Sequence, residues 1–192
     1  MSKKLLIEPV GAKGNLINLL EKPLTIEEFR GAPRTWEELK GSGVGQLPHY
    51  YGSDYGEVYA RYGNNNILCP LYNQMLGNYP VVHLSLLQSN ANSSVAKTVH
   101  QIVAERDDFP IRKCLLRYVD SLDKWIVNEK LQVDHINRNT LDSSRYNLQW
   151  VTATENQGRR ISKTDLPRVK RRSLAEGEVT MAEVDTSVRF NY

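Results

Sequence analysis

The sequence is poor in cysteine and has no long apolar run. Its 192 residues include two cysteines, too few for a disulfide framework or a four-thiolate zinc site, and free thiols suit a reducing compartment. The longest stretch without a charged residue, 62–96, contains seven asparagines and two prolines, which excludes a membrane-spanning helix. Near the N-terminus, Glu8 and Lys13 interrupt the apolar residues that a signal peptide needs. We therefore expect a cytoplasmic protein without membrane association.

The chain also lacks a large excess of either charge. It has 25 Lys and Arg against 22 Asp and Glu, a formal net charge of +3, with 40% hydrophobic and 24% charged residues. This composition is that of a globular protein of about one domain, and it excludes collagen-like, coiled-coil and disordered chains. The small net charge conceals two opposed segments. Residues 156–172 contain seven basic residues and one acidic residue, whereas 173–192 contain four acidic residues and one basic residue.

The first forty-odd residues read as a separate arm. Residues 24–29 place a threonine three positions before a glutamate, and 35–39 repeat this capping pattern, so we predict two short helices. Helices of this length are not stable alone. We expect Phe29, Trp36 and Leu39 to dock on the body of the protein or on a partner.

A sheet and a helix are predicted after a glycine-rich break at 41–45. Three short β-favouring runs follow, and the simplest arrangement is a three-stranded meander: 56–60, 67–72 and 79–86. Thr98 then caps a helix that ends before Pro110, and its apolar stripe of Val99, Ile102 and Val103 is expected to face this sheet.

The second half of the chain predicts a strand, a loop, a second strand and a helix. Residues 111–130 have apolar positions at mixed spacing, which leaves helix and strand open there. The four elements are then 131–135, 136–146, 148–152 and a helix from Ala153 to about Gly158. Beyond Arg160 the sequence is polar and keeps no apolar period.

Within these elements, three motifs occur in order: Val-Asp-His-Ile-Asn-Arg-Asn at 133–139, Asn-Leu-Gln-Trp-Val-Thr at 147–152 and Glu-Asn at 155–156. An Asp-His pair alone is a common accident. Together, the motifs closely resemble the signature of the HNH nuclease family, in the branch typical of phage and intron-encoded homing endonucleases. Trp150 alternates with Leu148 and is expected in the core.

The resemblance implies an α+β fold: a small antiparallel sheet plus helix, followed by a ββα-metal (His-Me) finger. Asp134 and Asn156 would be the two protein ligands of one divalent ion, and Asn156 replaces the family's final histidine. Oxygen ligands favour Mg²⁺ or Mn²⁺. His135 would be the general base toward water, since an imidazole titrates near neutral pH. Asn147 would hold the loop and so orient that imidazole.

A second resemblance lies upstream, in Tyr51-Gly-Ser-Asp-Tyr-Gly-Glu-Val-Tyr59. It is similar to a module that often precedes the finger in homing endonucleases, and 79–84 and 99–104 extend the likeness to about residues 50–160. The sequence departs from the family at Gln101, where a basic residue is usual, and by an insertion before Leu131. We interpret His100, His83 and His49 as structural, with assistance in the active site as the alternative for His100.

DNA contacts are expected after the metal helix, because basic side chains there would neutralise phosphates flanking the cut. A solvated basic tail is the alternative. The residues predicted to contact DNA are Asn139, Arg159, Arg160, Lys163, Arg168, Lys170, Arg171 and Arg172. For Asn139, a role in shaping the loop is the alternative.

The sequence thus predicts a metal-dependent DNA endonuclease, most simply a site-specific phage homing enzyme acting as a monomer or weak dimer. Its predicted parts are an N-terminal helical arm (1–45), a β-meander plus helix (46–110), an insertion (111–130), the nuclease finger (131–160) and a charged tail (161–192). The alternatives are a nuclease for restriction or genome packaging that acts with a partner, and a DNA-binding protein with an inactive finger. A protein partner of the arm is compatible with each.

Overall fold

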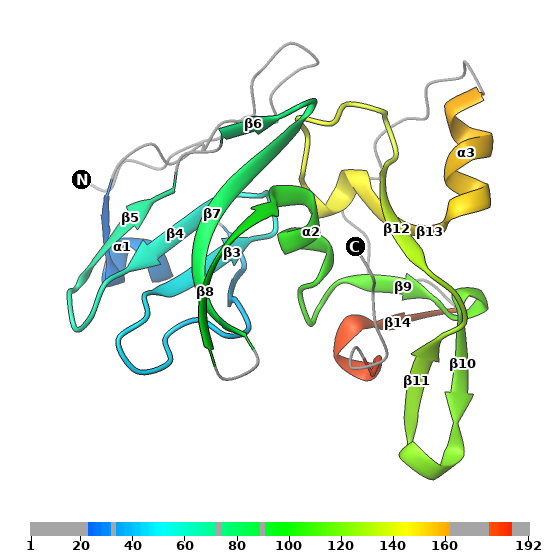
Figure 1. Cartoon of the computed structure of the whole chain (residues 1–192), viewed down its shortest axis with the longest axis horizontal. Helices are drawn as coiled ribbons and strands as arrows, with labels where there is room; N and C mark the ends of the chain where they lie inside the picture. The colour runs from blue at the N-terminus through cyan, green and yellow to red at the C-terminus, as the bar shows by residue number, and fades with distance from the viewer. Residues whose placement is uncertain (1–22, 32–33, 72–73, 89–90, 162–176, 186–192) are drawn as a thin grey trace. The chain divides into compact units, whose positions relative to one another are not determined.

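The structure is a computed structural model that describes residues 23–31, 34–71, 74–88, 91–161 and 177–185. The chain forms two compact units, shown with their elements in Figure 1. The first comprises the described residues up to 53 together with 57–99, and the second comprises 54–56 and the described residues from 100 onward.

The first unit contains two antiparallel sheets. One has five strands in the order β1-β5-β4-β3-β2: β1 (Leu24–Thr25), β2 (Trp36–Glu38), β3 (His49–Ser53), β4 (Val58–Arg61) and β5 (Ile67–Pro70). The other has three strands: β6 (Gln74–Leu76), β7 (Tyr79–Gln88) and β8 (Ala91–Thr98). The predicted strands therefore exist, but the three-stranded meander is wrong. β4 pairs with β5, whereas β7 belongs to the second sheet.

The N-terminal segment contributes strands to the first sheet. The predicted capping box is present at the start of α1 (Ile26–Arg30), with Thr25 as N-cap and Glu28 as its partner. The second predicted helix is wrong, because Trp36–Glu38 pairs with β3 instead. The Trp36 ring lies 4.3 Å from that of Phe29 (centroid to centroid). Strand pairing and aromatic burial outweigh a local helix signal that is worth only about 1 kcal/mol.

The glycine-rich segment is an ordered turn and not a flexible break. Gly41 has φ +80°, and its carbonyl accepts a hydrogen bond of 2.9 Å from the Leu87 amide. A Cβ at Gly41 would lie 2.8 Å from the Leu87 carbonyl oxygen, so only glycine fits this close approach.

The second unit carries the rest of the elements. They are α2 (Val99–Ala104), whose first residue lies in the first unit, β9 (Pro110–Arg112), η1 (Lys113–Leu115), β10 (Leu116–Val119), η2 (Asp120–Leu122), β11 (Lys124–Val127), β12 (Leu131–His135), η3 (Arg145–Asn147), β13 (Leu148–Thr152), α3 (Ala153–Ile161), β14 (Glu178–Thr180) and η4 (Met181–Glu183). The undecided region 111–130 thus forms strands interrupted by two short 3-10 helices, η1 and η2, and α3 extends three residues past Gly158. None of the helices in the described part of the chain combines the length and apolar character needed to span a bilayer.

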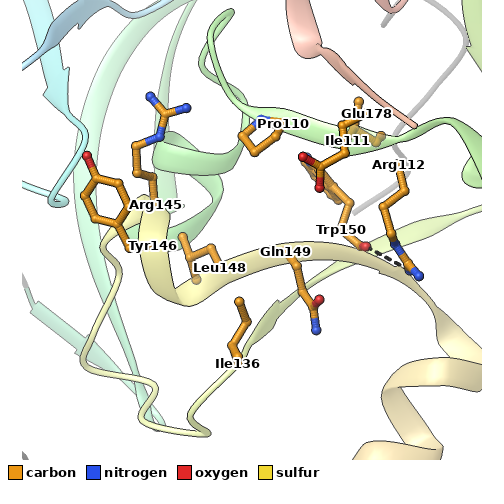
Figure 2. A pocket seen from close by; sticks show the side chains of 10 residues that line it. All are labelled: Pro110, Ile111, Arg112, Ile136, Arg145, Tyr146, Leu148, Gln149, Trp150 and Glu178. Carbon is orange, nitrogen blue, oxygen red and sulfur yellow. Dashed lines mark hydrogen bonds between the residues drawn. The ribbon is translucent and has the colours of Figure 1, made fainter. Parts of the chain in front are cut away.

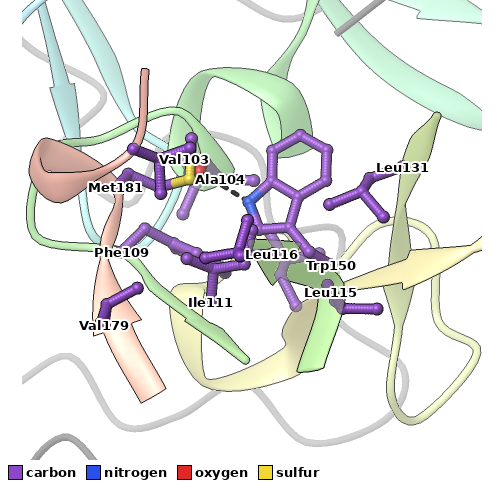
Figure 3. Packing of buried hydrophobic residues seen from close by; sticks show 12 residues of the cluster. Val103, Ala104, Phe109, Ile111, Leu115, Leu116, Leu131, Trp150, Val179 and Met181 are labelled. Atoms are coloured by element: carbon purple, nitrogen blue, oxygen red, sulfur yellow. Dashed lines mark hydrogen bonds between the residues drawn. The ribbon is translucent and has the colours of Figure 1, made fainter. Parts of the chain in front are cut away.

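The core of the second unit is built around Trp150 (Figure 3). Its side chain is 2% exposed, and its indole Nε1 donates a hydrogen bond of 3.2 Å to the Ala104 carbonyl at the end of α2. The fully or nearly buried residues around it are Val103, Ala104, Phe109, Ile111, Leu115, Leu116, Leu131, Leu148, Val179, Met181 and Val184. Val103 thus carries part of the predicted apolar stripe of α2 into this core, and the core position predicted for Trp150 is confirmed.

Residues 178–184 differ from the predicted charged tail. β14 pairs with β9, with Val179 opposite Ile111, and three apolar side chains, Val179, Met181 and Val184, are buried. The apolar residues of 178–184 are too few to predict a strand or helix from the sequence. The strand forms here because it pairs with β9, which is distant in sequence.

Truncation of Met181 should therefore destabilise the protein. Met181→Ala should lower the free energy of unfolding by about 2–5 kcal/mol, because it leaves a cavity in a packed core. Leu122→Ala, at a side chain 53% exposed, is the control and should change it by less than about 0.5 kcal/mol. Urea unfolding measures both, and equal effects would show that 178–184 does not pack in the core.

Candidate functional site

The pairing of β12 with β13 sorts the side chains of this hairpin onto two faces. Val133 lies opposite Trp150 and His135 opposite Leu148, whereas Asp134 lies opposite Gln149. Since side chains alternate along a strand, His135 shares the core face with Trp150. Asp134 lies on the other face.

The helix α3 follows the second strand directly because Thr152 caps it. The Thr152 hydroxyl accepts from the Glu155 amide at 3.1 Å, and the Glu155 carboxylate accepts from the Thr152 amide at 3.0 Å. This reciprocal capping box fixes where the helix begins. A salt bridge of 2.8 Å from Arg112 also holds Glu155, so the first turn of α3 is fixed to β9 as well.

Asn156 and Asp134 border the same face of the hairpin. The Asn156 Nδ2 donates to Gln132 Oε1 at 2.7 Å, and Gln132 is two residues before Asp134 on β12. The Asp134 Oδ2 accepts from Gln149 Nε2 at 2.9 Å. Because the Asn156 Nδ2 donates to Gln132, the Oδ1 of Asn156 is the atom of this side chain that could bind a cation. A carboxylate and an amide oxygen are hard donors that fit Mg²⁺ or Mn²⁺.

His135 lies against His100 of α2. The two rings are edge to face with centroids 5.1 Å apart, and the residues are 5% and 8% exposed. Burial lowers the pKa of His100 to about 4. Burial, and to a smaller degree the charge of His100, lowers the pKa of His135 to about 3. Both imidazoles are therefore neutral at neutral pH.

Asn147 ties the two ends of the loop together. It is fully buried, its Oδ1 accepts from the Asn137 amide at 2.9 Å, and its Nδ2 donates to the Asp142 carbonyl at 2.8 Å. The Asn147 carbonyl also accepts from the Ile136 amide at 2.7 Å. The loop therefore leaves β12 immediately after His135 in a fixed direction.

Further side chains of the loop stabilise it internally. Asn137 Oδ1 accepts from the Asn139 amide at 2.8 Å, and Asn139 Oδ1 accepts from the Leu141 amide at 3.2 Å. Such short-range turns are typical of asparagine. The structure thus gives Asn139 a role in shaping the loop, and its contact with DNA stays a prediction.

The tip of the upstream motif anchors the end of the loop within the same unit. The Asp54 carbonyl accepts from the Arg145 amide at 2.8 Å, and Asp54 Oδ2 accepts from the Tyr146 hydroxyl at 3.3 Å. Arg145 Nη1 also lies 2.5 Å from Asp108 Oδ2. Residues from two other parts of the chain therefore fix η3, which carries Asn147.

A cavity of about 130 Å³ lies beside β13 (Figure 2). It is lined by Pro110, Ile111, Arg112, Ile136, Arg145, Tyr146, Leu148, Gln149, Trp150 and Glu178. Gln149 connects the cavity to the candidate site, because this side chain also bonds Asp134.

The predicted DNA-contacting residues are only partly visible. Arg159 and Arg160 lie in α3, but their side chains are outside the described part of the structure, as are Lys163, Arg168, Lys170, Arg171 and Arg172 altogether. Their contacts stay predictions. Among the described residues, no three His, Cys, Asp or Glu side chains cluster as a metal site; the candidate ligands are one carboxylate and one amide.

The second unit thus presents a β-hairpin and a following helix, with Asp134 on the strand β12, Asn147 at the end of the loop and Asn156 in the helix α3. Residues 127–158 match the HNH endonuclease family. This segment contains the motifs that resemble the same family in the sequence. No curated protein matches the chain significantly.

The chain is also similar to a solved structure described as showing DNA binding and cleavage by the HNH homing endonuclease I-HmuI. The two sequences are 23% identical, and the TM-score is 0.43. The similarity covers 66% of this chain and 57% of the other, so the chain spans little more than half the length of that protein.

Sequence reasoning missed the residues that support the candidate ligands. Gln132 accepts a hydrogen bond from Asn156, and Gln149 donates one to Asp134. The backbone carbonyl of Asp142, a fully buried residue, accepts a hydrogen bond from the Asn147 side-chain amide. The alternation of apolar and polar residues at 131–135 contained a signal for Gln132, because it places Gln132 and Asp134 on one face.

Replacing the Asn147 amide with a carboxylate should loosen the loop. In Asn147→Asp the bond to the Asp142 carbonyl is lost and two oxygens face each other, so the free energy of unfolding should fall by about 1–3 kcal/mol. The Asn137 amide should exchange its hydrogen faster. The matched control is Asn139→Asp, which keeps the acceptor for Leu141. If both variants are equally stable, Asn147 does not tie the loop.

Proposed function

We propose that this protein is a metal-dependent DNA endonuclease whose active site lies at the end of the β12–β13 hairpin. The observation that carries the proposal is the match of residues 127–158 to HNH endonucleases, together with the position of Asp134 on the same face of β12 as Gln132, which bonds Asn156 of α3. The reaction is the hydrolysis of a phosphodiester bond of DNA.

Asp134 and Asn156 hold one divalent cation, Mg²⁺ or Mn²⁺. Their oxygen atoms suit a hard cation, and hydrogen bonds from Gln149 and to Gln132 orient the two side chains. When bound, such an ion relieves negative charge on the phosphate and on the leaving oxygen. Two protein ligands leave coordination positions for substrate and water.

His135 accepts the proton of the attacking water, and Asn147 positions the His135 imidazole. The imidazole is neutral at neutral pH, but burial lowers its pKa to about 3 and so weakens it as a base, which means that it has to be hydrated in the DNA complex before it can accept the proton. Asp134 and His135 are the last two residues of β12 but lie on opposite faces of the hairpin, so a phosphate has to bind at the end of this strand to reach both. Asn147 acts through the loop, whose first amides it holds.

The substrate is double-stranded DNA, held in part by the basic segment that begins in α3. Cations of that segment contact phosphates without reading sequence. A single finger has one active site, so a monomer nicks one strand, and double-strand cleavage needs two copies or two events. The resemblance of the motifs to homing endonucleases favours cleavage at one or few long sites over general degradation.

One observation favours a second candidate, a DNA-binding protein whose finger does not cut. His135 is 5% exposed and lies against His100, whereas a general base must meet water in the bound complex. In the nuclease, binding of DNA must bring water to this imidazole. The wild-type protein with Mg²⁺ and DNA distinguishes the two, since the second candidate binds without producing cut ends.

Removal of the His135 imidazole should abolish cleavage and retain binding. His135→Ala should lower the rate of cutting at saturating DNA by about 10²–10⁴-fold, the usual contribution of general base catalysis. DNA affinity should change little, because the phosphates are held by other side chains. The control is His83→Ala, an exposed histidine of the first unit, which should cut normally. Undiminished cutting by His135→Ala would exclude it as the base.

Cleavage should also require the cation. Chelation of divalent ions should stop cutting, and added Mg²⁺ or Mn²⁺ should restore it, whereas DNA binding should persist in the chelator. Sequencing of the DNA ends on a phage genome then shows whether one long site or many sites are cut. Cutting that continues in the chelator would contradict a metal-dependent reaction.

A further inference from the structure

The insertion between β9 and β12 folds into a β-hairpin with exposed side chains. β10 pairs with β11 through residues 116–119 and 124–127, and Figure 1 shows this hairpin extending from the rest of its unit. Leu116 and Ile126 are buried at its base, and the Asn128 amide donates to the Leu115 carbonyl at 3.1 Å. The hairpin is therefore fixed to the core that also carries the finger.

The register separates the hairpin into two chemically different faces. Tyr118 lies opposite Trp125, with ring centroids 5.2 Å apart, and the Lys113 ammonium lies 5.5 Å from the centre of the Trp125 ring. On the other face, Arg117 lies opposite Ile126 and Lys124 opposite Val119. Below, the first is called the aromatic face and the second the basic face.

The basic face holds two exposed cations close together. Arg117 and Lys124 are diagonal neighbours on the two strands, about 7 Å apart by the usual sheet spacing, and both are exposed. The carboxylates of the hairpin, Asp120 and Asp123, lie in its turn. There the Asp123 carboxylate accepts a hydrogen bond from the Tyr118 hydroxyl. Two like charges on one face repel each other in the free protein, and a polyanion removes this repulsion.

We propose that the basic face of the β10–β11 hairpin binds the phosphate backbone of double-stranded DNA through Arg117 and Lys124. A two-stranded β-ribbon is narrow enough to lie along or in a groove of DNA, and three residues separate β11 from the finger strand β12. This inference rests on the proposed function for its substrate and adds a contact surface outside the finger.

The test measures DNA affinity as a function of salt with the full chain and a labelled duplex, in a chelator that prevents cutting. Each of Arg117→Gln and Lys124→Gln should lower the slope of log affinity against log salt by about 0.9 and weaken binding roughly five-fold at about 0.15 M salt. The double variant should show both losses. Lys113→Gln is the matched control, since it removes the same charge from the aromatic face and should leave the slope unchanged.

Folding and catalysis provide the remaining controls. The double variant should unfold at the same urea concentration as the wild type and cut at the same rate at saturating DNA. A double variant with the wild-type slope would overturn the inference, as would an equal loss in Lys113→Gln. If the wild type cuts and the slopes do not change, this inference alone fails. If the slopes change but the wild type does not cut, the proposed nuclease fails and the binding surface stands.

Discussion

The register of β12 on β13 is the constraint on which the rest of the second unit depends. With Val133 opposite Trp150 and Asp134 opposite Gln149, the apolar side chains fill the core, and on the polar face Gln132 bonds Asn156 of α3. A slip of one residue would exchange the two faces. It would expose Trp150, which bonds the end of α2, and bury Asp134. The same packing that stabilises the unit therefore sets the position of the candidate ligands.

The fixed loop and the capped helix extend this constraint to the chemistry. Asn147 spans the loop from Asn137 to Asp142, and the Thr152–Glu155 box starts α3 immediately after β13. The candidate site thus combines side chains from a strand, a loop and a helix that are each held by buried or reciprocal hydrogen bonds. Such preorganisation is what binding of a cation and a phosphate requires.

Sequence reasoning predicted the β12–β13 hairpin and α3 better than the rest of the fold, for physical reasons. The strands around Asp134 and Trp150 carry strong local alternation, and the motifs resemble those of the HNH family, whose model matches residues 127–158. The first unit was harder, since the capping pattern at Thr35 was overridden when Trp36–Glu38 paired with β3. Residues 178–184 acquire structure only from β9, a partner distant in sequence. The alternation at 131–135 places Gln132 on the face of Asp134, but the contact of His135 with His100 depends on tertiary packing, which no local pattern reports.

The central claim is that Asp134 and Asn156 together hold a divalent cation, and binding of Mn²⁺ to the DNA-free protein tests it most directly. Titration followed by the paramagnetic signal of Mn²⁺ should show one ion per chain in the wild type. Asp134→Ala and Asn156→Ala should each lose this binding, whereas Asn139→Ala, in the adjoining loop, should retain it. If Asp134→Ala and Asn156→Ala bind Mn²⁺ with the wild-type stoichiometry and affinity, these two residues are not its ligands and the account is contradicted.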